Sequence, residues 1–278
     1  MLNISYVNSK GDRIYLTKEP YMMLADTEIF NPEWKIKFQD KKYIKNIYKE
    51  CLDDSIQIRV SGKNYTDYLN NLNALFDVME YDMLNDKSGK LYLNDFYLNC
   101  RIYEFKKPDK FLLVPQATVE CSICSDGAFM WNKDVIHQIK WKDYITSEIG
   151  KKYPYRYPYR YISQNSHHMT INLDIQADVY PEFIIYGKAN DPLIQINDIL
   201  YGAFVELDKN EILVVNSELG KIYTQRGQAT TNVFNRRFNN DMLNEFPLDT
   251  RRLNIYWNND FDFDLILHEK RGEPIYED

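Results

Sequence analysis

The sequence has 278 residues, of which 44% are hydrophobic and 15% aromatic, so it carries enough apolar material for globular cores and too much for a disordered chain. Its formal net charge of −7 and pI near 5.3 argue against a surface built for specific nucleic-acid binding. No run approaches the roughly 18 apolar residues of a membrane span, and residues 1–13 lack the apolar core of a signal peptide, so we expect no membrane insertion and synthesis in the cytoplasm.

Short strand candidates open the chain. Residues 4–7 and 13–16 have strand-like composition, and the turn-like residues 8–11 join them. Residues 17–50 are polar and weakly patterned, so the sequence does not place them. A further strand is predicted at 55–60.

The clearest element of the first half is a helix. Asn64 is placed to cap it, and Asp67 falls in its first turn, where the helix dipole favours a carboxylate. The apolar residues that recur at helical spacing are Tyr65, Tyr68, Leu69, Leu72, Leu75, Phe76 and Met79. This stripe predicts a helix over about 65–83 that packs on a sheet.

Strand patterns follow the helix. Residues 90–93 and 96–105 flank a turn, and 111–123 continue the predicted sheet. Residues 132–150 are ambiguous between helix and strand. The first half, residues 1–150, is therefore predicted to be an α+β domain.

The four cysteines, Cys51, Cys100, Cys121 and Cys124, are too few for a disulfide scaffold in a chain of this length. Cys121 and Cys124 have the spacing of a zinc knuckle, but no second pair follows. On a strand, positions three apart point to opposite faces. We therefore expect buried free thiols and no metal site.

A short tyrosine–proline repeat lies near the middle of the chain. Each proline fixes its own φ and disfavours helix at the tyrosine before it, so the stretch should be extended, with its tyrosines on one side. It consists of Tyr153, Pro154, Tyr155, Arg156, Tyr157, Pro158, Tyr159, Arg160 and Tyr161. One interpretation is a stiff interdomain joint whose tyrosines pack on a neighbouring domain. The other is an aromatic strip that binds a ligand or partner.

The second half, residues 151–278, reads as nearly pure β and is entered through the Tyr153–Tyr161 joint. About eight short strands separated by turn signals are typical of a sandwich or jelly roll. The strand candidates are 171–177, 183–186, 193–196, 203–207, 212–215, 221–224, 253–257 and 261–268. The whole chain is thus predicted to be mainly β, with an α+β first half.

No residue pattern indicates an enzyme or a cofactor. Asp260, Asp262 and Asp264 alternate with apolar residues and should share one strand face, where repelling carboxylates discourage unwanted strand pairing. His167 and His168 are adjacent and diverge on a strand, so they do not chelate together. Phosphate-binding and nucleophile motifs are absent from the sequence.

Several features together resemble the distal tail protein family of phages that infect Gram-positive bacteria, a family also found in tail-like bacteriocins and prophages. The most specific is the Tyr-Pro-Tyr repeat that enters a β domain. The others are the turn at 9–11, the helix at 65–83, the Gly89–Leu93 and Cys100–Ile102 hairpin, the strand with Trp257, and Arg271–Pro274. The likeness covers most of the chain and is weakest over 17–50.

This resemblance implies a structural role at the distal end of a virion tail. The resemblance implies that copies of the chain form a ring, usually a hexamer. Each subunit would have a tail-tube-like N-terminal domain and a galectin-like or carbohydrate-module-like C-terminal β-sandwich. The implied partners are further copies of the chain, the tail tube protein, the tail-tip or baseplate hub protein and the tape measure protein. The N-terminal sheet, with the hairpin at 90–105, is the expected site of ring contacts.

A carbohydrate-binding tail or cell-wall module is the alternative. It depends on the predicted sandwich and on exposed aromatic side chains, since aromatic faces stack on sugars. Trp257 and the tyrosine repeat at 153–161 are the candidates for that contact.

Overall fold

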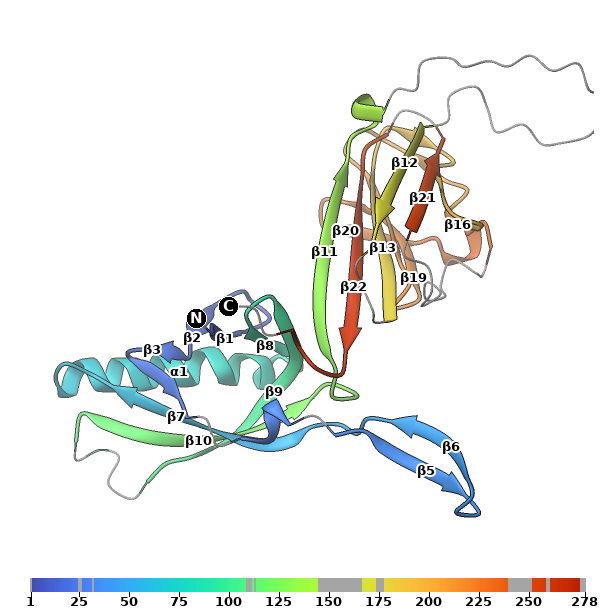
Figure 1. Ribbon diagram of the computed structural model, residues 1–278. Coiled ribbons are helices and arrows are strands. Elements are labelled where there is room, and N and C mark those ends of the chain that lie inside the picture. The colour runs from blue at the N-terminus through green and yellow to red at the C-terminus, as the bar shows by residue number, and fades with distance from the viewer. Residues whose placement is uncertain are drawn as a thin grey trace, which may run out of the picture. The chain divides into compact units, whose positions relative to one another are not determined.

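The computed structural model describes residues 2–24, 27–31, 33–108, 112, 114–144, 167–173, 178–239, 252–258 and 261–275 (Figure 1). Within these ranges the chain is mainly β with one α-helix, which confirms the predicted fold class. It divides into two compact units. Unit 1 comprises Met1–Lys133 with Arg271–Asp278, and unit 2 comprises Asp134–Lys270.

The main sheet of unit 1 is antiparallel, in the order β3-β4-β7-β10-β9, and β8 links β9 to β1 and β2. Its strands are β1 (Ile4–Val7), β2 (Arg13–Tyr15), β3 (Thr17–Lys18), β4 (Tyr21–Met23), β7 (Asp53–Ser61), β8 (Gly89–Leu93), β9 (Phe96–Lys106) and β10 (Gln116–Ser125), and η1 (Glu28–Phe30) is a 3₁₀-helix. The strands predicted at 4–7, 13–16, 55–60, 90–93 and 96–105 are confirmed within a few residues.

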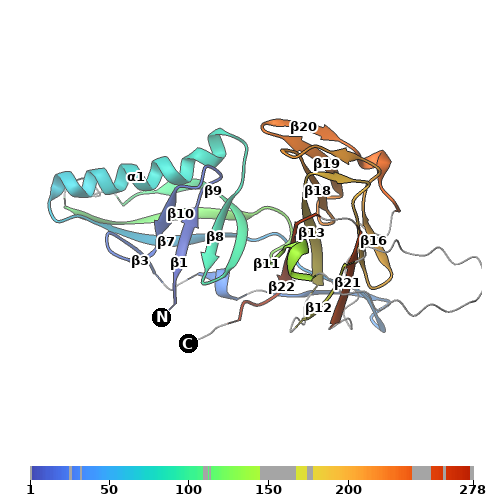
Figure 2. The ribbon, with the colours of Figure 1, turned by 90° about the horizontal axis from the view of Figure 1, so that it is seen from above.

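Helix α1 (Tyr65–Leu84) confirms the predicted helix. The side chain of Asn64 accepts a hydrogen bond from Asp67 N at 2.9 Å, which satisfies a backbone donor of the first turn. The helix lies against β7 and β9, as Figure 2 shows. Its buried residues are Tyr68, Leu72, Leu75, Met79 and Asp82.

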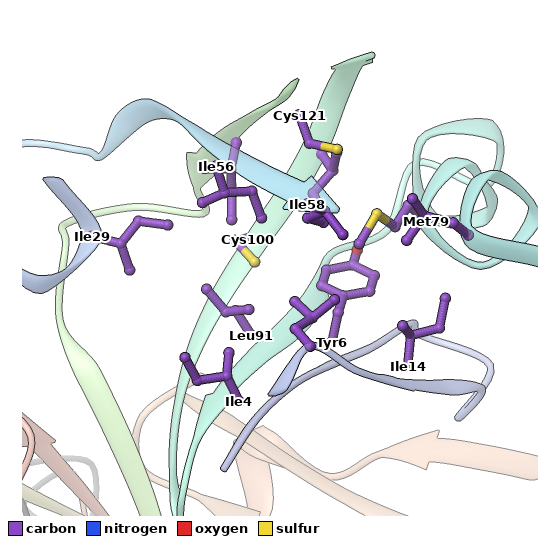
Figure 3. Packing of buried hydrophobic residues seen from close by; sticks show 14 of the residues in the cluster. Ile4, Tyr6, Ile14, Ile29, Ile56, Ile58, Met79, Leu91, Cys100 and Cys121 are labelled. Atoms are coloured by element: carbon purple, nitrogen blue, oxygen red, sulfur yellow. The ribbon is translucent and has the colours of Figure 1, made fainter. Parts of the chain in front are cut away.

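The core of unit 1 lies between α1 and the sheet. Figure 3 shows Tyr6, Ile58, Cys100 and Met79 converging from two strands of the sheet, β1 and the helix. All four side chains are fully buried. Because the inward residues of β7, β9 and β10 alternate with outward ones, the helix covers a continuous apolar face.

Two further strands, β5 (Lys35–Gln39) and β6 (Tyr43–Tyr48), form a separate antiparallel hairpin in unit 1. Figure 1 shows it as a two-stranded ribbon apart from the main sheet of its unit. Asp40 and Lys41 at its tip both have positive φ, and Lys42 N donates to Gln39 O at 3.0 Å, so the turn is of type I′. This hairpin lies in the region that the sequence pattern did not place.

Unit 2 is a sandwich of two antiparallel sheets, as predicted, with orders β11-β22-β13-β18-β19-β20 and β12-β21-β15-β16; β14 and β17 form a small third sheet. Its strands are β11 (Trp131–Ile139), β12 (His167–Asn172), β13 (Asp178–Tyr186), β14 (Ala189–Asn190), β15 (Leu193–Ile196), β16 (Ile199–Gly202), β17 (Glu206–Leu207), β18 (Ile212–Asn216), β19 (Lys221–Arg226), β20 (Ala229–Asn232), β21 (Arg252–Trp257) and β22 (Phe263–Arg271). Two 3₁₀-helices, η2 (Trp141–Tyr144) and η3 (Phe234–Arg236), complete it.

The boundary between the units differs from the predicted one at 150/151. The chain passes from unit 1 to unit 2 within β11 and returns at the end of β22. Residues 134–144 and 167–173, on either side of the predicted Tyr153–Tyr161 joint, belong to the same unit. The predicted boundary is wrong for two reasons. Residues 132–150 have no clear strand pattern, so the sequence does not predict β11. No local pattern indicates that the residues after β22 belong to the first unit.

Candidate interaction surface

The hairpin β5–β6 exposes a wholly apolar face. In its register Ile36 pairs with Ile47 and, beyond a bulge, Phe38 pairs with Ile44, and residues directly opposite each other in an antiparallel pair share a face. These four side chains are 48%, 52%, 56% and 56% exposed, in that order. We call Ile36, Phe38, Ile44 and Ile47 the hairpin apolar face.

The other face and the tip of the hairpin are polar and basic. Lys35, Lys37, Gln39, Tyr43, Asn46 and Tyr48 alternate with the apolar residues. Residues 33–50 hold six lysines and three acidic side chains, a net charge of +3, whereas the whole chain carries −7. The rest of the chain therefore carries −10 and has the charge opposite to that of the hairpin.

The base of the hairpin is anchored in unit 1 by Lys49. Its ammonium donates a hydrogen bond to Gly272 O at 2.8 Å and lies 5.1 Å from the ring centre of Trp34 and 5.4 Å from that of Phe129. Burial lowers the pKa of the Lys49 ammonium. This contact holds Gly272, the residue after the end of β22, beside the hairpin base.

The hairpin has the composition of a surface that another molecule covers. An isolated two-stranded hairpin is marginal in water because it has no second layer to bury its apolar side chains. Four aliphatic or aromatic side chains on one face add a further cost of exposure. A partner surface that covers the hairpin apolar face removes both costs.

Unit 2 contains a polar cluster across three strands. His268 on β22 is 9% exposed; its Nδ1 lies 2.8 Å from Asp134 Oδ1 on β11, and its Nε2 lies 2.9 Å from Glu182 Oε2 on β13. Burial alone disfavours the charged ring, but the two hydrogen bonds and the two carboxylate charges outweigh it and raise the pKa of His268 to about 9. Residues far apart in sequence form this cluster, and neither of the carboxylates shows a pattern that marks it.

The aspartates predicted to share a strand face have separate structural roles. Asp262 precedes β22 and accepts a hydrogen bond from Trp141 N at 3.0 Å, while Asp264 accepts one from the Tyr186 hydroxyl at 2.7 Å. Asp260 lies outside the described residues. Together these contacts tie the start of β22 to η2 and β13.

The predicted aromatic contacts have two outcomes. Trp257 is 2% exposed and packs within 5.1 Å of the His167 ring, so the expectation that it offers an exposed face to a sugar is wrong. Its strand alternation directs it into the core between the two sheets of unit 2. The residues of the predicted joint, Tyr153, Pro154, Tyr155, Tyr157, Pro158, Tyr159 and Tyr161, lie outside the described residues, so their packing role stays a prediction.

The structure also shows where the two adjacent histidines lie and where the hairpin of the predicted ring contacts lies. His167 is buried and His168 is exposed, so the two diverge as predicted. In the hairpin of β8 and β9, the residues Leu91, Leu93, Leu98 and Cys100 are buried in the core of unit 1. Within the described ranges, no group of three or more His, Cys, Asp or Glu side chains is arranged to hold a metal ion.

The cysteines differ in access. All four are free; Cys100 and Cys121 are buried, Cys124 is half-buried and Cys51 is exposed, so the expectation of burial is wrong for Cys51. Burial, with a smaller contribution from Glu120, raises the pKa of the Cys121 thiol to about 12, and burial also raises that of Cys100.

Thiol labelling should follow this order. Because a thiol reacts as its thiolate, we expect iodoacetamide to modify Cys51 in the native protein and to reach Cys100 and Cys121 only after denaturant is added. Intact-mass and peptide analysis with and without urea measures this. Cys51→Ser is the matched control, and it should lose the labelling that the native wild type shows. Rapid labelling of Cys121 in the native protein would contradict the buried position of this residue on β10.

No protein-family model and no curated protein sequence matches this chain. Within the described part of the chain, no helix combines the length and the apolar character needed to cross a membrane.

Solved structures do match its fold. The Dit protein of phage SPP1, described as a paradigm of the hub adsorption apparatus in phages that infect Gram-positive bacteria, superposes with a TM-score of 0.56 at 10% identity, over 97% of this chain and 99% of that one. A chain of the phage P2 baseplate in its activated conformation with Ca gives 0.60 at 10% identity, over 99% and 100%. The corresponding structure with Sr gives 0.57 at 10% identity, over 96% and 98%. The predicted resemblance is confirmed at the level of fold: along nearly its whole length, this chain has the architecture of phage hub and baseplate proteins.

Proposed function

We propose that this chain is a structural, non-enzymatic adaptor at the distal end of a phage-type tail. It forms a closed homo-oligomeric ring, with six copies as the expected number, that joins the tail tube to the tail-tip or baseplate hub. Its further partners are the tube protein, the hub protein and the tape measure protein. The fold similarity to hub and baseplate proteins supports this role.

The exposed hairpin apolar face is the observation that carries the proposal. A face of one subunit that meets a different face of the next generates a ring when the rotation closes. The hairpin supplies one such face, and the net charge of +3 on residues 33–50 complements the −10 of the remaining chain, which favours a second copy as the partner. We therefore propose ring contacts on β5–β6 in preference to the hairpin of β8 and β9, whose apolar residues are buried in the core of unit 1.

The test compares two pairs of substitutions on the same strands. Ile36→Ser with Ile47→Ser removes half of the hairpin apolar face, whereas Gln39→Ser with Asn46→Ser changes two uncharged side chains on the opposite face of the same two strands. All four side chains are exposed, so both variants should fold. We expect light scattering to give an oligomer for the wild-type chain and for the control pair, and a monomer for the Ile pair.

Class averages from electron microscopy should show rings for the first two proteins and none for the third. A wild-type chain that stays monomeric at high concentration, even with purified tube and hub proteins present, would contradict the ring. An Ile-pair variant that still forms rings would leave the ring in place and remove the hairpin from its interface.

A further inference from the structure

A groove lies on the outer face of the larger sheet of unit 2, over β13, β18, β19 and β20. It has a volume of ≈ 450 Å³, and the loop between β18 and β19 and helix η3 border it. Figure 2 shows β18, β19 and β20 in succession toward the edge of the sheet. The side chains that matter to the argument are Glu182, Asn216, Tyr223, Gln225, Asn232 and Phe234.

Strand alternation presents these side chains to the groove. On β19, Ile222 is 1% exposed and points into the core, so Tyr223 and Gln225 face the other way. In the register of the sheet Tyr223 lies opposite Asn232, and Gln225 lies opposite Thr230, so all four share the outer face. The Tyr223 ring therefore lines the groove on the same face as the amide groups of Gln225 and Asn232 and the hydroxyl of Thr230.

The polar groups are held in place by their own hydrogen bonds. Asn232 Oδ1 accepts from Phe234 N at 2.9 Å, and Gln225 Nε2 donates to Gly227 O at 2.9 Å. Glu182 Oε2 is bound to His268 Nε2 at 2.9 Å, which fixes the carboxylate. Each of these three side chains has a second polar atom that can meet a ligand: Asn232 Nδ2, Gln225 Oε1 and Glu182 Oε1. The hydrogen bonds described above set the orientation of each group before a ligand arrives.

The chemistry of this lining selects the class of ligand. Amides combine a donor and an acceptor, as sugar hydroxyls do, and a fixed carboxylate accepts from hydroxyl groups. Lys221 and Glu182 contribute one charge of each sign, so the groove does not favour a strongly anionic ligand. A partly exposed tyrosine ring offers an apolar plane that fits the C–H face of a pyranose.

We propose that this groove binds a neutral saccharide, with the Tyr223 ring against a sugar ring and with Gln225, Asn232 and Glu182 as hydroxyl partners. The site lies wholly in unit 2 and the hairpin in unit 1, so the two proposals share no residue and can be tested separately. It would give a tail component an affinity for glycan-bearing surfaces in addition to its place in the particle.

The test uses the full chain and a printed array of neutral oligosaccharides built from hexoses, N-acetylhexosamines and deoxyhexoses. Titration calorimetry and saturation-transfer NMR with the best-bound glycan follow. Tyr223→Ala should weaken binding by about tenfold or more, because both the stacking and the burial of the ring are lost. Tyr223→Phe keeps the ring and should stay within about threefold of the wild type, since it removes one hydroxyl at most.

The matched control is Tyr256→Ala, because Tyr256 is also partly exposed but lies on β21 in the other sheet of the sandwich. It should leave affinity unchanged, and saturation transfer should be strongest for the protons on the sugar face that meets Tyr223. No saturable binding anywhere on the array would overturn the proposal. So would binding that Tyr256→Ala abolishes and Tyr223→Ala does not, since the sugar would then occupy the opposite face.

Discussion

Replacing Asp82 with alanine is expected to destabilise unit 1 by about 3 kcal/mol, since it leaves two donors without their acceptor. Asp82 is a fully buried carboxylate near the end of α1. Its Oδ2 accepts from the Tyr6 hydroxyl at 2.7 Å, and its Oδ1 accepts from Ser9 N at 2.8 Å. Burial is the main cause that raises the pKa of Tyr6, with contributions from Cys100 and Asp82, so the hydroxyl stays protonated and remains a donor.

Hydrogen exchange measured by mass spectrometry locates the effect. Peptides from β1 and α1 should lose protection in Asp82→Ala, while peptides from unit 2 keep theirs. Asp77→Ala, on the exposed face of the same helix, should change the free energy of unfolding by no more than about 0.5 kcal/mol. Tyr6→Phe removes one of the two donors and should cost about 1–3 kcal/mol. Equal protection in Asp82→Ala and Asp77→Ala would contradict the role assigned to the buried carboxylate.

Gly89 completes this arrangement. A Cβ at Gly89 would overlap the Tyr6 hydroxyl and Asp82 Oδ2, so the start of β8 approaches the pair as closely as it does only because the residue is glycine. Gly89→Ala should therefore destabilise unit 1 by disrupting the hydrogen bond between the Tyr6 hydroxyl and Asp82. In a double-mutant cycle, its cost should be smaller in a Tyr6→Phe background, where the hydroxyl is gone.

Much of this core follows from local sequence. The helical spacing from Tyr65 to Met79 and the cap at Asn64 are short-range signals, and period-2 alternation identifies the inward residues of β9. The buried Asp82 escapes such a pattern. A carboxylate in the last turn of a helix reads as solvent-exposed unless its partners, Tyr6 and Ser9 more than 70 residues away, are known.

The interaction surfaces were harder to predict for a related reason. Ile36 and Phe38 alternate with lysines on β5, but Lys45 is an extra residue on β6, so Ile44 and Ile47 lie three apart and residues 17–50 give no clear strand pattern. The groove of unit 2 joins residues from four strands and η3, and its concavity depends on pairings that no local pattern specifies. Trp257 shows the reverse error, because an aromatic residue on a short strand was assigned to the surface and packs in the core.

We expect the His268 cluster to contribute about 3 kcal/mol to the free energy of unfolding of unit 2, and we expect this contribution to depend on pH. The ordinary pKa of histidine is 6.5, and that of His268 in the folded protein is about 9. Because the folded pKa is raised, the stabilisation is present in full below pH 6.5 and is lost as the pH rises through 9. The charged ring donates to Asp134 and Glu182 together; the neutral ring donates to one and leaves the other carboxylate buried beside a lone pair.

Comparison of wild type with His268→Gln isolates this term from other groups that titrate in the same range. The difference in unfolding free energy between the two proteins should be large at pH 6 and should shrink by about 3 kcal/mol as the pH approaches and passes 9. Urea titrations at three pH values, with hydrogen exchange to assign the loss to β11, β13 and β22, measure it. His168→Gln, on the exposed face of β12, should follow the wild-type profile. A difference that does not vary with pH would mean that His268 stabilises unit 2 by packing and that its charge contributes nothing.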